Sequence, residues 1–196
     1  MTLSTLELQN GPQPQASLII LHGLGADGED FIPVCRALQL PDVGDLRFVL
    51  PSAPEMPVSL NGGYVMRAWY DIRPPGQQPR EDESGLRQAQ AWIDALIERE
   101  IERGIPAHRI GLMGFSQGCA MALMTGLRFR ERLGALVGLS SRGSQSGHAH
   151  LSGAWRSGRC RADRTRHPVT QPPAVAGLSG HLARLPDRPH PVPGRG

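Results

Sequence analysis

Gly114-Phe115-Ser116-Gln117-Gly118 places a serine between two glycines in the pattern Gly-x-Ser-x-Gly. The mostly apolar residues 109–113 before it have the length of a buried strand. The residues after it repeat apolar side chains at helical spacing, namely Ala120, Leu123, Met124 and Leu127 within 119–127. A serine at a sharp turn between a strand and a helix projects its hydroxyl from the sheet edge as a nucleophile. This context predicts a nucleophilic Ser116 rather than a glycine-rich turn without chemistry.

The rest of the first 141 residues alternates between strand-like and helix-like patterns. A helix is expected over 84–103, where one face is apolar, and a shorter one over 31–40. Residues 55–83 form a long irregular segment, and loops of that length inside a compact domain are often functional. Continuous apolar runs predict buried strands at 17–21, 46–50, 109–113 and 135–139. Strands that alternate with helices predict an open, mostly parallel sheet with helices on both faces.

Composition changes abruptly near residue 141. Residues 1–141 hold 12 Arg and 16 Asp plus Glu, a formal charge of −4, whereas residues 142–196 hold 9 Arg and 2 Asp, a charge of +7. The second segment has 7 Pro and 8 Gly, and its Leu and Val together number only 7. Such a segment has too little apolar surface to offset the entropy of ordering a chain. We therefore expect residues 142–196 to be a disordered basic tail.

The sequence lacks the signatures of export and of membrane insertion. The first residues show no basic start followed by an apolar core, and no apolar run reaches the length of a membrane span. The three cysteines, Cys35, Cys119 and Cys160, are widely spaced and form no metal or disulfide pattern. These features predict a cytoplasmic protein with reduced thiols and no metal.

Four separated motifs resemble the carboxylesterase/phospholipase family that includes the acyl-protein thioesterases. They are His22-Gly23-Leu24-Gly25-Ala26-Asp27-Gly28, Pro51-Ser52-Ala53-Pro54, Asn61-Gly62-Gly63 with Ala68-Trp69-Tyr70-Asp71-Ile72, and the stretch around Ser116. The resemblance covers about residues 15–141. It implies an α/β-hydrolase fold with a mostly parallel sheet, of which the C-terminal part is missing or non-native in this chain.

The resemblance implies a role for particular residues. Ser116 is expected to attack the carbonyl of an ester or thioester, while the backbone N–H groups of Leu24 and Gln117 form the oxyanion hole. The residue pattern agrees, because Gln117 follows the nucleophile and Leu24 lies in the loop after an early strand. His22 precedes that loop, where such families keep a structural histidine, although the role of catalytic base is the alternative.

The substrate contacts are expected in the long segment 55–83. Trp69 and Tyr70 are candidates to line the acyl pocket, with core packing as the alternative. Met66 is a further candidate in the same segment, and Met56, Val58 and Leu60 are weaker ones. The implied substrate is a small-molecule ester or thioester.

The aspartate and histidine of a catalytic triad are not identifiable in this chain. The family places both after the serine, but Asp163 and Asp187 follow no apolar run. Five histidines satisfy the chain order alone: His148, His150, His167, His181 and His190. Because the family pattern and the composition change at the same place, we hypothesise that residues from about 142 onward are a frameshifted reading of the original coding sequence. A natural basic tail is the alternative.

Two functional classes remain open at this point. The first is a serine carboxylesterase or thioesterase acting through an acyl-Ser116 intermediate. The second is a non-catalytic remnant that binds an acyl group or a partner without turnover. Nucleic acid is not an expected partner, because the basic tail has a single aromatic residue, Trp155, and no recognised module. No metal or organic cofactor is implied, and the oligomeric state is open, with a homo-oligomer as one alternative.

Overall fold

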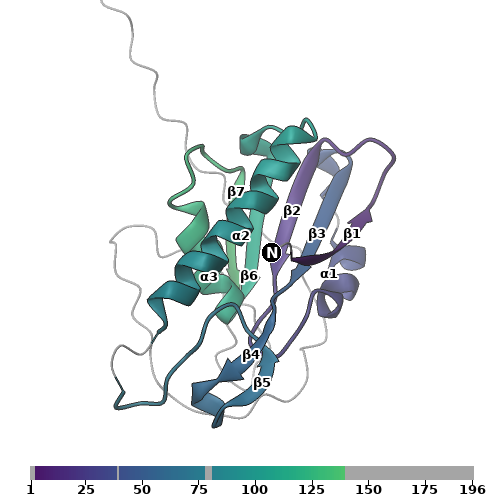
Figure 1. The fold of residues 1–196 in the computed structure, drawn as a ribbon. Helices are drawn as coiled ribbons and strands as arrows, with labels where there is room; N and C mark the ends of the chain where they lie inside the picture. Colours follow the sequence, from purple (N-terminus) through teal and green to yellow (C-terminus); the bar gives the residue numbers. More distant parts are fainter. Residues whose placement is uncertain (1–2, 39, 78–80, 140–196) are drawn as a thin grey trace, which may run out of the picture.

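The computed structural model describes residues 3–38, 40–77 and 81–139. The predictions for residues 142–196, the disordered tail and the frameshift, lie outside these ranges. The main sheet has the strand order β1-β3-β2-β6-β7, in which β1 is antiparallel to β3 and the other neighbours are parallel (Figure 1). Its strands are β1 (Ser4–Gln9), β2 (Ala16–Leu21), β3 (Leu46–Ser52), β6 (Ile110–Phe115) and β7 (Ala135–Leu139).

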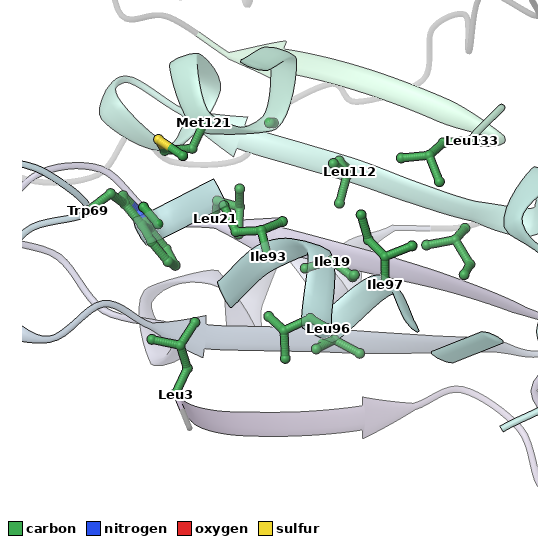
Figure 2. Packing of buried hydrophobic residues seen from close by; sticks show 14 of the residues in the cluster. Leu3, Ile19, Leu21, Trp69, Ile93, Leu96, Ile97, Leu112, Met121 and Leu133 are labelled. Carbon is green, nitrogen blue, oxygen red and sulfur yellow. The ribbon is translucent and has the colours of Figure 1, made fainter. Parts of the chain in front are cut away.

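Helices cover both faces of this sheet, as the alternating pattern predicts (Figure 1). The helices α2 (Glu83–Glu102) and α3 (Gln117–Gly126) pack on one face, and α1 (Ile32–Ala37) packs on the other. Each face therefore has its own apolar cluster. The cluster under α2 and α3 includes Ile19, Leu21, Trp69, Ile93, Leu96, Ile97, Leu112, Met121 and Leu133 (Figure 2). The expected mostly parallel sheet with helices on both faces is confirmed.

The helix predicted over 84–103 forms as α2, shifted by one residue at each end. The Asp82 side chain caps its start by accepting a hydrogen bond from the Ser84 N–H (3.1 Å), and Gly104 follows its end at a φ of 92°. The predicted apolar face is the buried one, where Ala89 and Ile93 are fully enclosed. The helical spacing of apolar residues was sufficient to predict α2, because its apolar face is continuous over five turns.

The irregular segment predicted over 55–83 is wrong in its first part, because a two-stranded hairpin forms there. The strands β4 (Glu55–Val58) and β5 (Tyr64–Arg67) pair antiparallel, joined by a short 3-10 turn, η3 (Ser59–Asn61). Gly62 and Gly63 close the turn at φ values of 68° and 82°, which glycine adopts without strain. Pro57 obscured β4, since a proline inside a short run argues against a strand.

Two other elements differ from the prediction. The strand β1 was not anticipated, and it pairs with the edge of β3 from Ser4–Ser52 to Gln9–Arg47. The helix expected over 31–40 is shorter: a 3-10 turn, η1 (Glu29–Phe31), leads into α1, and Pro33 stands in its first turn.

A buried charge network fixes the C-terminal end of α2 to the sheet. Glu100 is fully buried and accepts hydrogen bonds from Ser17 Oγ (2.5 Å), Arg47 Nη1 (2.9 Å) and Arg103 Nη1 (3.0 Å). Arg103 also donates to Glu7 of β1. The network thus links α2 to β1, β2 and β3, at the opposite end of the sheet from Ser116.

The strand β7 forms one edge of the sheet within the described residues. It pairs with β6 from Gly111–Ala135 to Phe115–Leu139, and none of the other described strands pairs with its outer side. All five of its residues are partly exposed, in contrast to the enclosed β2. In the ranges that the structure describes, no helix is long and apolar enough to cross a membrane.

Candidate active site

Ser116 lies at the junction between β6 and α3, which begins at the next residue. Its backbone has φ 51° and ψ −111°, and it is the sole non-glycine residue with positive φ among the described residues. The backbone of a non-glycine residue is strained in this conformation, so the surrounding structure must hold it in place. Its N–H donates to the Leu139 C=O (2.9 Å), and the residue itself is exposed. This backbone is the one that a nucleophilic elbow requires.

The glycines on either side of Ser116 permit two close backbone approaches. A Cβ at Gly114 would collide with the backbone of Gly118 and Cys119. A Cβ at Gly118 would collide with the C=O groups of Leu21 and His22, at the end of β2. The start of α3 is therefore packed directly against the segment that leads into the Leu24 loop. The Gly-x-Ser-x-Gly pattern has a steric reason at both glycines.

The helix α3 confirms the helix expected after the serine, but its buried side is not the apolar stripe that indicated it. Ala120 and Leu127 are exposed, Leu127 by 53% of its surface. The buried residues of α3 are Gln117, Gly118, Met121, Ala122 and Thr125. The buried face of α3 therefore combines the large apolar Met121 with small and polar residues.

The two expected oxyanion donors lie in the two segments that the elbow brings together. Leu24 is in the loop after β2, and Gln117 is the first residue of α3. The backbone N–H groups of Leu24 and Gln117 donate no hydrogen bond to any group in the described part of the chain. Both amides remain available to a ligand, and their assignment to an oxyanion hole stays a prediction.

His22 is fully buried, and both of its ring nitrogens are occupied by backbone groups. The Ala53 N–H donates to Nε2 (2.9 Å), so Nδ1 carries the proton and donates to the Gly23 C=O (2.7 Å). Burial lowers the pKa of His22 below its ordinary value of 6.5. A histidine bound in this way joins the ends of β2 and β3. These contacts support the structural role over that of a catalytic base.

The buried neutral His22 predicts a stability that depends on pH. Because its pKa is lower in the folded protein, the unfolded chain binds the additional proton as pH falls below 6.5. The free energy of unfolding should then decrease with falling pH, by up to about 1.4 kcal/mol per pH unit. Urea titrations between pH 7.5 and 5 should show this loss in the wild type and a smaller one in His22→Gln. An equal loss of unfolding free energy in the wild type and in His22→Gln would contradict the prediction. His108→Gln, at an exposed position, is the control.

The candidate acyl contacts occupy different environments. Trp69 is 1% exposed and belongs to the core cluster that also contains Leu21 and Met121 (Figure 2). Its indole N–H donates to the His22 C=O (2.9 Å), and the two rings are 5.1 Å apart. Tyr70 is also buried, and burial, together with Glu81 and Cys119, raises the pKa of its hydroxyl to about 12. The hydrogen bond to His22 gives Trp69 a role in anchoring its loop. A substrate contact by Trp69 or Tyr70 stays a prediction.

Met66 lies next to the Leu24 loop. It lies in β5, one residue before the strand ends, and a Cβ at Gly25 would be 3.6 Å from its sulfur atom. The weaker candidates on the hairpin differ from one another: Val58 is fully buried, Met56 is half-buried, and Leu60 is 38% exposed. Of the candidates on the hairpin, Met66 is the one that the structure places next to the Leu24 loop.

The described residues place no histidine as a base for Ser116. Besides His22, the histidine in these ranges is His108, which precedes β6 at the opposite end from the elbow. The strand between them has six residues, about 20 Å of extended chain. Asp163, Asp187 and the five later histidines lie outside the described residues. Within the described ranges, no cluster of three or more His, Cys, Asp or Glu side chains is arranged to hold a metal ion.

Comparison with known proteins gives consistent results. The acyl-protein thioesterase 1 of Yarrowia lipolytica is 39% identical over 127 residues, covering 64% of this chain and 56% of that protein. The crystal structure of Zea mays acyl-protein thioesterase 2 superposes with a TM-score of 0.59 at 29% identity, over 70% of this chain and 61% of that one. The crystal structure of Arabidopsis thaliana SOBER1 gives a TM-score of 0.58 at 31% identity, over 63% and 61% of the two chains.

The extent of these matches is limited on both sides. The chain spans little more than half the length of the thioesterase relative from Yarrowia. The profile of the phospholipase/carboxylesterase family matches residues 5–153, a longer region than the 15–141 indicated by the motifs. The solved relatives and the parallel sheet confirm the α/β-hydrolase fold for the matched part. The chain therefore belongs to the phospholipase/carboxylesterase family.

Proposed function

We propose that this protein is a serine hydrolase of carboxylic esters or thioesters that acts through an acyl-Ser116 intermediate. The observation that carries the proposal is the strained, exposed Ser116 at the junction of β6 and α3. The backbone N–H groups of Leu24 and Gln117, which lie in adjacent segments and have no hydrogen-bond partner among the described residues, support it. The substrate is a small-molecule ester or thioester, and no cofactor takes part in the reaction.

In the proposed reaction, Ser116 Oγ attacks the acyl carbon while its proton passes to a base. The oxyanion of the tetrahedral intermediate accepts hydrogen bonds from the N–H groups of Leu24 and Gln117. The leaving alcohol or thiol takes up the proton, and water then cleaves the acyl-serine ester to give the acid. Each donor of an oxyanion hole contributes about 10²–10³ to the rate. Aspartate and histidine from beyond Leu139 are needed for the full rate.

A chromogenic ester tests the proposal directly. Incubation with p-nitrophenyl butyrate should release p-nitrophenol and leave a butyryl group on the peptide that contains Ser116, found by mass spectrometry. Ser116→Ala should lose both signals, whereas Ser84→Ala, at an exposed serine of α2, should keep them. An acyl group elsewhere, or none, would contradict the proposal. Saturable binding of a fatty acid without acylation would instead favour the non-catalytic alternative.

A further inference from the structure

The segment from Arg67 to Tyr70 is hydrogen bonded to the loop that contains Leu24. The Gly25 N–H donates to the Arg67 C=O (2.9 Å), and the Trp69 indole N–H donates to the His22 C=O (2.9 Å). These two bonds lie on either side of Leu24 in the sequence. The position of the Leu24 amide is therefore determined largely by where residues 67–70 are held.

The same segment is hydrogen bonded to the elbow through one side chain. The Gln117 carboxamide accepts from the Trp69 N–H (2.8 Å) and donates to the Tyr70 C=O (2.8 Å). Gln117 is 4% exposed, so both bonds are shielded from water. A carboxamide is suited to this place because it presents one acceptor and one donor side by side.

A third set of contacts fixes residues 67–70 to the end of β3. The Arg67 guanidinium donates to the Ala53 C=O (3.0 Å), and the Ala68 N–H donates to the Pro54 C=O (3.2 Å). The Ala53 N–H in turn donates to His22 Nε2. Residues 67–70 are thus held by the β3 end, the Leu24 loop and the elbow together.

We propose that residues 67–70 are a brace that sets the separation of the two oxyanion donors, and that the Gln117 carboxamide is its positioning group. This inference rests on the proposed function, because it assigns a purpose to the brace within that reaction. Gln117 then has two roles, its N–H as a donor to the oxyanion and its side chain as the link to Leu24. Donors must lie about 2.7–3.1 Å from the oxyanion, so a loosened link reduces rate more than substrate binding.

Amide exchange tests the brace without requiring any reaction. Gln117→Met removes both carboxamide bonds and keeps the volume and the backbone N–H. Loss of a buried hydrogen bond should speed exchange of the Trp69 and Gly25 amides about tenfold, while the Ile97 amide in α2 stays unchanged. Unchanged exchange at Gly25 would overturn the brace. Trp69→Phe should also speed exchange of the Gly25 amide. Trp92→Phe, at another tryptophan packed on the core, is its control.

A pH series with Gln117→Glu tests the effect on chemistry. An ionised carboxylate accepts from the Trp69 N–H but cannot donate to the Tyr70 C=O, whereas the protonated acid does both. Relative to wild type, the rate of Ser116 acylation at saturating ester should fall about 10–100-fold at pH 8 and recover at pH 5, with KM unchanged. Gln88→Glu, on the exposed side of α2, should show neither effect.

The two experiments separate the brace from the proposed function. A rate ratio that is constant with pH, or a rise in KM alone, would overturn the positioning role of the carboxamide. If the wild-type chain fails to acylate Ser116, the proposed function fails. The exchange experiment then still decides whether Gln117 holds residues 67–70 against the Leu24 loop.

Discussion

Extending residues 1–139 with the C-terminal third of an acyl-protein thioesterase is expected to raise kcat for p-nitrophenyl butyrate by about 10⁴–10⁶. The reason is the absence of a base beside Ser116 among the described residues. A serine hydroxyl without an adjacent base stays close to its free pKa and is a weak nucleophile. Binding and an oxyanion hole alone leave about 10³–10⁴ over the reaction in water. Completion of the triad supplies the remaining acceleration.

Ser116→Ala, made in the original chain and in the extended chain, is the control for this prediction. In both chains it should abolish acylation at position 116, and in the extended chain it should also remove nearly the whole gain in kcat, since triad residues act as a unit. A folded extended chain without the gain would rule out Ser116 as the nucleophile. A rate in the original chain equal to that of the extended one would show that a histidine after residue 141 already serves as the base.

Glu100→Ala is expected to lower the free energy of unfolding by about 3–5 kcal/mol. Glu100 is fully buried between Ser17, Arg47 and Arg103. Its removal leaves the Arg47 guanidinium, whose side chain is 14% exposed, without its carboxylate. An uncompensated buried charge costs much more than the ion pair itself contributes. Urea unfolding followed by tryptophan fluorescence measures the loss, because Trp69 is enclosed in the core.

An exposed ion pair made by a neighbouring residue of α2 provides the matched control. Glu98 pairs with Arg130 at 2.8 Å, and both side chains are at least one third exposed. Glu98→Ala should therefore cost less than about 1 kcal/mol. The loss of unfolding free energy in Glu100→Gln should lie between those of Glu98→Ala and Glu100→Ala. The amide still accepts a hydrogen bond from Ser17 but carries no charge. Equal losses in Glu98→Ala and Glu100→Ala would contradict the role of burial.

Most of the fold could be predicted because the decisive patterns are long or unbroken. The strands β2, β3, β6 and β7 are mostly apolar runs, and α2 repeats its apolar face over its full length. The elbow was recognisable because two glycines and a serine have a steric reason to occur together. Such local patterns depend little on the rest of the chain.

The elements that were missed depend on contacts between distant residues. The strand β1 is stabilised by pairing with β3, and only two of its six residues are apolar. The burial of Glu100 follows from partners 83 and 53 residues away, which no helical pattern reveals. The carboxamide of Gln117 likewise pairs with residues 48 and 47 positions distant. Its glutamine identity is the one sequence signal that a polar link existed.

The site itself could be predicted only in part. The placement of Ser116 follows from local sequence, and so does that of the loop with Leu24. The base does not, because a triad is assembled from loops far apart in the chain. Residues Asp163 and His181 illustrate the difficulty, since chain order alone permits them and no strand pattern precedes them.

Because none of the other described strands pairs with the outer side of β7, residue 139 is a natural junction for a split reporter enzyme. The nucleophile and its expected donors precede this junction, and the expected base follows it. Two fragments divided here would meet along the edge of one strand and would be inactive apart. Fusing each fragment to one member of a binding pair raises their effective concentration, so that ester hydrolysis reports association of the pair. The outer side of β7 would then be the contact between the two halves of a sensor.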